Sequence, residues 1–180
     1  MVKEEAIGAV AYFRVHPNRL WQRLQFFYND PSRNFLKLKL AGELEAELIQ
    51  IEQNLQEFLD ADEITVNFRI KFLDIVASEV NLKEPKKPIL SFEILSEEYQ
   101  LVSGENIIEL ISDPEPTEYR CLSEWQFPGA LIQVVSPMPH KLPSKNEVQF
   151  EIPVGNLVGG KESFLFTYCP EKSLLKNYED

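Results

Sequence analysis

The stretch LAGELEAELIQIEQNLQEFLDADEITVNFRIKF, residues 40–72, contains the change of pattern that decides the predicted fold. Its first part has apolar residues three or four positions apart, which is the spacing of one stripe along an α-helix. These residues are Leu40, Leu44, Leu48, Ile51, Leu55 and Phe58. After Glu63, apolar and polar residues alternate from Ile64 to Phe72, a pattern typical of a half-buried strand. The sequence therefore predicts a helix that ends before Glu63 and a strand that follows it.

The residues before this stretch predict a further helix. Pro17 interrupts the chain, and proline is well tolerated at the first position of a helix. A helix over residues 17–28 would place large apolar side chains on one face, namely Leu20, Trp21, Leu24, Phe27 and Tyr28. Residues 6–15 fit either a strand or an earlier helix, and we favour the helix. Residues 1–61 are accordingly expected to form an N-terminal helical hairpin.

The distribution of charge favours the pairing of these helices. Residues 14–39 contain six basic side chains and one acidic side chain, whereas residues 40–63 contain eight acidic side chains and no basic one. Folding one segment back on the other would bring opposite charges together, although an exposed ion pair contributes only about 0–1 kcal/mol. The charges thus select the pairing more than they stabilise it.

The rest of the chain predicts short strands joined by turns. Ten of the twelve prolines lie after residue 60, among seven or eight short apolar runs. Proline disfavours helix interiors and is common in turns. We therefore predict an α+β chain in three parts. These are the helical hairpin, an antiparallel β-sandwich (Ig-like or C2-like) of seven to eight strands over residues 62–172, and a C-terminal tail over residues 173–180.

Composition argues against several kinds of partner. The formal net charge of -11 disfavours binding to duplex nucleic acid, which proteins contact through basic surfaces. No apolar run approaches the roughly 18 residues of a membrane-spanning helix, and Glu4 and Glu5 occupy positions where a signal peptide is basic. We therefore expect a cytoplasmic protein without membrane insertion, in which Cys121 and Cys169 stay as thiols.

The sequence contains no catalytic or cofactor-binding motif. His16 and His140 are isolated and the two cysteines are far apart, so neither a zinc site nor a nucleophile beside a base is predicted. Calcium needs six to eight oxygen ligands, and the acidic loop around Asp113 and Glu115 supplies too few. We therefore predict no metal and no cofactor. One alternative is a small hydrolase or lyase with a loop site near Asp113, His140 and Lys141.

Two groups of residues are candidate interaction sites. In the first, aromatic and basic side chains are interleaved, as they are at many protein interfaces, although core packing explains the aromatic residues equally well. The second is the apolar stripe of the helix, which must rest on the β domain or on a partner. The candidates are Arg14, Arg19, Trp21, Arg23, Phe27, Tyr28, Leu44, Leu48, Ile51 and Leu55.

These observations favour a non-enzymatic protein-binding or structural assembly component. Its partners would be other protein chains, including a second copy of itself that pairs through residues 40–59. A further alternative, besides the hydrolase or lyase, is a module that binds an anionic surface through a basic face from Arg14 to Arg33. The three hypotheses require different features: an exposed apolar stripe, a polar pocket or a continuous basic face.

Overall fold

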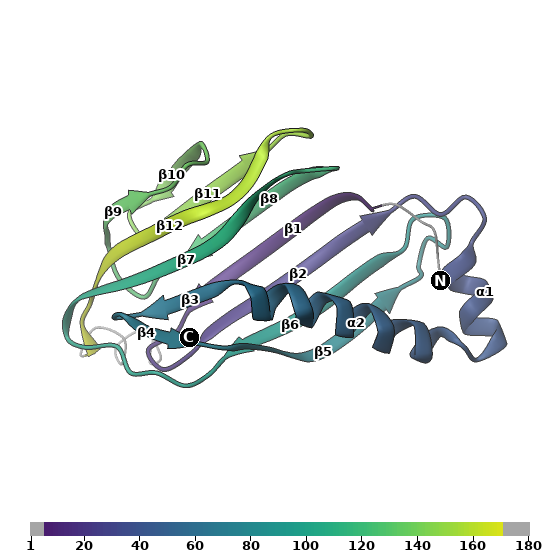
Figure 1. The fold of residues 1–180 in the computed structure, drawn as a ribbon, viewed down its shortest axis with the longest axis horizontal. Coiled ribbons are helices and arrows are strands. Elements are labelled where there is room, and N and C mark those ends of the chain that lie inside the picture. The colour runs from purple at the N-terminus through teal and green to yellow at the C-terminus, as the bar shows by residue number, and fades with distance from the viewer. Residues whose placement is uncertain (1–5, 171–180) are drawn as a thin grey trace, which may run out of the picture.

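Two β-sheets packed face to face form the body of the protein (Figure 1). The computed structural model describes residues 6–170. The elements are β1 (Ala6–Val15), β2 (Leu20–Tyr28), α1 (Asn34–Ala41), α2 (Leu44–Ala61), β3 (Glu63–Val66), β4 (Arg69–Lys71), β5 (Leu73–Asn81), β6 (Ile89–Ser96), β7 (Gly104–Pro116), β8 (Arg120–Gln126), β9 (Leu131–Val135), β10 (His140–Ser144), β11 (Glu147–Ile152) and β12 (Leu157–Tyr168). The large sheet has the order β10-β11-β8-β1-β2-β6-β5, and the small sheet has the order β4-β3-β7-β12-β9.

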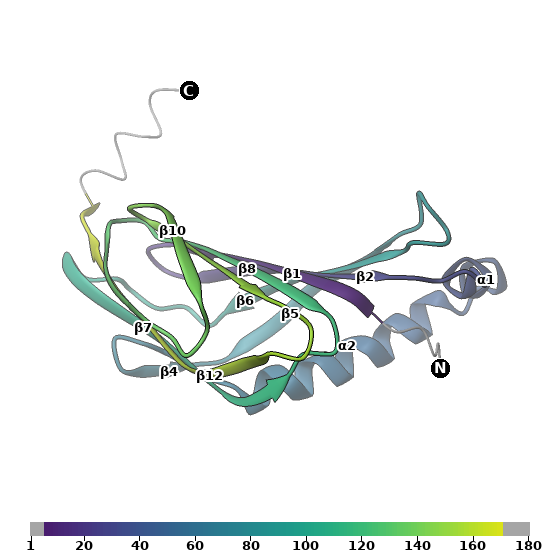
Figure 2. The ribbon, with the colours of Figure 1, turned by 90° about the horizontal axis from the view of Figure 1, so that it is seen from above.

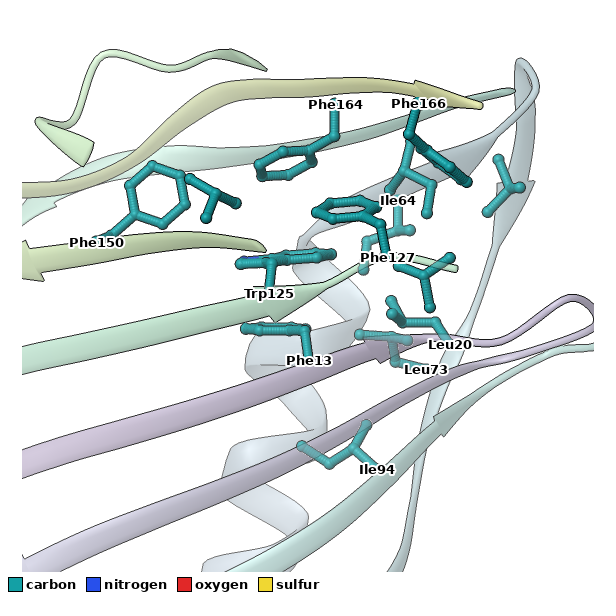
Figure 3. Close-up of a cluster of buried hydrophobic side chains, with 14 of the residues drawn as sticks. Phe13, Leu20, Ile64, Leu73, Ile94, Trp125, Phe127, Phe150, Phe164 and Phe166 are labelled. Carbon is teal, nitrogen blue, oxygen red and sulfur yellow. The ribbon is translucent and has the colours of Figure 1, made fainter. Parts of the chain in front are cut away.

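Aromatic side chains fill the space between the two sheets at one end (Figure 3). Phe13 of β1 stacks on Trp125 of β8, with ring centroids 3.9 Å apart. The Trp125 ring also packs against Phe164 of β12, at a centroid distance of 4.7 Å. This row of rings crosses from the large sheet to the small sheet, and it combines large apolar burial with favourable ring geometry. The aromatic cluster therefore holds the two sheets together.

Helix α2 covers the part of the large sheet that the small sheet leaves open (Figure 1 and Figure 2). Its apolar stripe packs against the core of the protein through Leu44, Leu48, Ile51, Leu55 and Leu59. The Gln56 side chain fixes the helix along β5. Its Nε2 donates a hydrogen bond to the Leu73 carbonyl oxygen (2.7 Å), and its Oε1 accepts one from the Ile75 N–H (3.2 Å).

The predicted N-terminal helical hairpin is wrong, because residues 6–28 form the strands β1 and β2. Leu20 and Leu24 lie four positions apart, a spacing that suits one face of a helix and one face of a strand equally well. Tertiary pairing resolves this ambiguity. Strand β1 lies between β2 and the distant β8, with which it pairs in parallel, so its backbone groups are satisfied on both sides.

The helix predicted over residues 40–59 is present as α2, and the shorter α1 precedes it. The two helices are separated at Gly42, whose φ of 76° is the left-handed conformation that glycine readily adopts at the end of a helix. The expected charge pairing between two helices is absent for Arg19 and Arg23, which form ion pairs with Glu98 and Glu79 at 3.0 Å. Neither of the helices described in residues 6–170 is long and apolar enough to cross a membrane.

The single strand predicted from Ile64 to Phe72 is a hairpin of β3 and β4. Asn67 and Phe68 form its turn, with φ of 50° and 64°, which is the backbone of a type I′ turn. The Asn67 Oδ1 accepts a hydrogen bond from the Ile107 N–H at 3.0 Å and so fixes the turn against β7.

The β-sandwich predicted over residues 62–172 is confirmed in part: two sheets pack face to face, but the strand count of seven to eight and the purely antiparallel arrangement are wrong. Residues 63–168 form ten strands, β3 to β12, and the parallel pairing of β1 with β8 makes the large sheet mixed. This arrangement differs from the purely antiparallel Ig-like and C2-like sandwiches.

Candidate functional site

A groove lies between the two layers, beyond the aromatic cluster. Its volume of about 480 Å³ is within the range typical of small-molecule pockets. Its lining comes from the large sheet, mainly β1, β2 and β8, which we call the floor, and from the C-terminal end of α2 and parts of β7 and β12, which we call the walls. Phe13 and Trp125 of the aromatic cluster also contribute to its lining. We call this feature the inner groove.

Small side chains on two neighbouring strands hollow out the floor of the inner groove. The parallel register of β1 and β8 pairs Ala9 with Cys121, Ala11 with Ser123, and Phe13 with Trp125. Along both strands, therefore, the inward side chains are first small and then large and aromatic. The sandwich is filled where the aromatic side chains lie and is open where the small ones lie, because alanine and serine cannot reach the opposite layer.

The inner groove exposes apolar surface to solvent. Phe58 of α2 lies on its wall and is 67% exposed. On the floor, the ring of Tyr119 meets Phe26 edge-on at a centroid distance of 6.3 Å. Burial raises the pKa of Tyr119 to about 12, so its hydroxyl stays neutral at physiological pH and can form a hydrogen bond with a bound molecule. The lining is thus largely apolar, with a few polar groups.

Glu162 of β12 is a buried carboxylate in this lining. It is only 4% exposed and faces inward, on the same side of the strand as Phe164 and Phe166. Within residues 6–170 its carboxylate has no hydrogen-bond or ion-pair partner. Loss of hydration raises the pKa of Glu162 from its usual 4.5 to about 7. The groove therefore contains a largely buried acidic residue whose carboxylate has no partner in the described part of the protein.

Three more acidic side chains line the inner groove. They are Asp62, directly after α2, and Asp113 and Glu115 of β7. Burial, and to a lesser extent the negative charges of Asp113 and Glu115, raise the pKa of Asp62 to about 6. The lining, as far as the structure describes the chain, contains no lysine, arginine or histidine. The described lining therefore contains acidic side chains and no basic side chain, which favours a negative potential in the groove.

The predicted aromatic and basic residues lie mostly on the outer face of the large sheet. The guanidinium carbon of Arg14 lies 5.7 Å from the ring centroid of Trp21, a cation–π contact. Arg23 forms ion pairs with Glu79 and, at 3.7 Å, with Glu93, and Arg19 pairs with Glu98. Arg33 lies apart from them, at the start of α1. The structure brings Arg14 and Trp21 together but does not assemble the four arginines into one basic face.

The other predicted interaction residues, except Phe27, pack inside the protein. Tyr28 packs against Phe35 of α1 at a centroid distance of 5.5 Å. Phe27 is partly exposed and is not among the residues that pack against the core, although its backbone is paired with Ile89 of β6. Leu44, Leu48, Ile51 and Leu55 of α2 pack on the protein's own core, as described above.

A second hollow, of about 490 Å³, lies on the outer face of the large sheet beside Tyr12, Arg14 and Trp21. Polar groups in its lining bind each other: the Gln149 Nε2 donates a hydrogen bond of 2.6 Å to the Glu124 Oε1. The inner groove is the stronger candidate site because it combines exposed apolar surface with a carboxylate that lacks a partner.

The residues of the hydrolase or lyase hypothesis do not meet in one site. Asp113 lines the inner groove, whereas His140 and Lys141 of β10 lie in a separate shallow pocket with Glu151. No three potential metal ligands among histidine, cysteine, aspartate and glutamate come together within residues 6–170. The acids of the inner groove are therefore spread along it and do not converge on one point.

Sequence reasoning missed both Glu162 and the floor of the groove. Glu162 continues the alternation of Phe164 and Phe166, so its inward direction could have been inferred from the strand pattern. Ala9 and Ala11 indicate a hollow floor only once residues 6–15 are known to form a strand. Their small neighbours on β8 depend on a parallel register that no local pattern encodes.

Comparison with known proteins identifies no family for this chain. No protein-family model and no curated protein sequence matches it. Among solved structures, the NMR structure of the folded domain of LppM from Mycobacterium tuberculosis matches with 9% sequence identity and a TM-score of 0.47. The match covers 95% of each chain. A likeness this distant carries no argument about the site, so the functional proposal depends on the geometry alone.

Proposed function

We propose that this protein is a non-enzymatic binding protein that holds a small, largely apolar molecule in its inner groove. The observation that carries the proposal is an open groove of about 480 Å³ in a core that is otherwise filled by aromatic side chains. Protein interiors are normally close-packed, and an unfilled apolar space reduces stability. A bound molecule would restore the missing contacts and would cover the exposed ring of Phe58.

The affinity would come mainly from apolar burial. Each Å² of apolar surface removed from water contributes roughly 25 cal/mol, so even a molecule of modest size can bind to a preformed groove. The two layers are held in place by the aromatic cluster and by Gln56, which favours a groove that is formed before the ligand arrives. Preorganisation lowers the cost of binding.

Fluorescence offers a direct test, because the chain has two tryptophans and one of them lines the groove. Replacing Trp21 with phenylalanine leaves Trp125 as the only tryptophan. A neutral apolar dye such as Nile red should then bind at micromolar concentration, gain fluorescence and quench the Trp125 emission in a saturable manner. Absence of saturable binding would contradict the proposal.

Two matched variants locate the binding site. Ala11→Phe places a large side chain on the groove floor, whereas Val10→Phe makes a comparable change on the opposite face of the same strand. Ala11→Phe should weaken dye binding by at least about tenfold through direct competition for space, and Val10→Phe should leave it unchanged. Circular dichroism and melting temperatures must show that both variants fold. Equal binding by both folded variants would place the dye elsewhere and reject the groove as the site.

A second candidate function, association with another copy of the chain, is favoured by the β3–β4 hairpin. Phe68 and Ile70 of this hairpin, and Phe72 directly after it, are each more than half exposed, and large apolar and aromatic side chains are enriched at protein interfaces. Sedimentation velocity at tens of micromolar would test it. A dimer that disappears in the double variant Phe68→Ser/Phe72→Ser supports self-association through the hairpin, and a monomer at every concentration contradicts it.

A further inference from the structure

We propose that the molecule bound in the inner groove is an apolar amine whose protonated nitrogen is received by Glu162. This inference rests on the proposed function and specifies the chemical class of the ligand. It follows from three features of the groove: a buried acceptor without a partner, an absence of positive charge in the described lining, and acidic groups that do not form a metal site.

The first feature is the state of Glu162. Glu162 as a residue is only 4% exposed, and buried carboxylates normally have hydrogen-bond or ion-pair partners, because burying a charge without them is costly. Glu162 has none in residues 6–170, and its carboxylate lines the groove. A protonated amine bound there would supply both the opposite charge and the hydrogen-bond donors that the protein does not provide.

The second feature is the charge along the groove. Besides Glu162, the lining contributes Asp62, Asp113 and Glu115 and, within the described residues, no basic side chain. A molecule with a negatively charged head, such as a carboxylate or a phosphate, would enter against this potential and would find no cation to pair with. A positively charged head would be attracted along the same path.

The third feature separates an organic cation from a metal ion. A calcium or magnesium ion needs several oxygen ligands that converge on one point, and the described residues offer no such convergence of three ligands. Leu110 is the cross-strand partner of Glu162, and Phe26 and Ala9 line the same groove. Acidic groups distributed along an apolar groove suit an amine that carries an apolar body.

Three probes with the same ten-carbon chain test the inference on the unmodified protein. Decylamine is cationic at pH 7, decanol is neutral and decanoate is anionic. Their affinities can be compared by displacement of Nile red below their aggregation concentrations. Decylamine should bind about ten- to a hundredfold more tightly than decanol, because a charge-assisted hydrogen bond in a desolvated site contributes that much. Decanoate should bind most weakly.

The Glu162→Gln variant tests whether the preference for decylamine depends on this one carboxylate. Its control is Glu105→Gln, at an exposed position of β7. Glu162→Gln should abolish the preference for decylamine and leave decanol binding unchanged, and Glu105→Gln should change neither.

Each outcome separates this inference from the proposed function. If decanol binds to the unmodified protein as tightly as decylamine, or decanoate binds best, the amine class is wrong and the groove remains a binding site. If none of the three probes displaces the dye, or the dye does not bind, the proposed function itself fails. Because the comparison of probes uses the unmodified protein, it decides the question even if Glu162→Gln does not fold.

Discussion

Replacing Glu162 with glutamine should remove a loss of stability that occurs as the pH rises. Burial raises the folded-state pKa of Glu162 to about 7, whereas the unfolded chain has the usual value of 4.5. As the pH rises, the unfolded state therefore releases this proton first. The stability that depends on the protonated carboxyl is complete below pH 4.5 and is lost as the pH rises through about 7.

The size of this effect follows from the two pKa values. Each pKa unit corresponds to about 1.4 kcal/mol, so the full effect is about 3 kcal/mol. Most of it, roughly 2.5 kcal/mol, falls between pH 5 and pH 8. The free energy of unfolding of Glu162→Gln, measured relative to the unmodified protein, should therefore increase by about that amount over this interval.

Urea unfolding followed by circular dichroism at pH 5, 6, 7 and 8 measures this difference. Asp62 also titrates in this range, because burial and its acidic neighbours raise its pKa to about 6, but it is present in both proteins and its contribution largely cancels. Glu105→Gln removes one negative charge at an exposed position and controls for the overall charge. Parallel stability profiles for Glu162→Gln and the unmodified protein would refute the claim that Glu162 is buried without a partner.

Two further substitutions test the contacts that shape the fold. Gln56→Ala should lower the free energy of unfolding by about 1–3 kcal/mol, because it leaves the Leu73 carbonyl and the Ile75 N–H of β5 without partners. Gln50→Ala is the control, because it removes only an exposed hydrogen bond to Asn54 within α2, and it should lower the free energy of unfolding by no more than about 0.5 kcal/mol. Equal losses of unfolding free energy in the two variants, measured by urea unfolding, would show that Gln56 does not fix the helix to the sheet. Phe68→Gly should raise the melting temperature and stabilise the protein by at most about 1 kcal/mol, because relief of the left-handed strain at a φ of 64° exceeds the entropy that glycine adds to the unfolded chain. A lower melting temperature would mean that the exposed ring of Phe68 makes a stabilising contact.

The sequence by itself determined the elements whose pattern is unambiguous over a long stretch. The stripe from Leu44 to Leu55 repeats over several helical turns, and only a helix can place those residues on one face, so α2 was predictable. Many of the later strands were also predictable, because short apolar runs between prolines leave few other options.

Only the tertiary structure decided that residues 6–28 form strands and that the groove exists. The spacing of Leu20 and Leu24 suits a helix or a strand, and the choice depends on strand β8, which is more than a hundred residues away in the chain. The same parallel register places Ala9 beside Cys121 and Ala11 beside Ser123, and so creates the hollow floor. A local pattern fixes which side chains share a face, whereas the pairing of distant strands fixes which faces meet and where space is left between them.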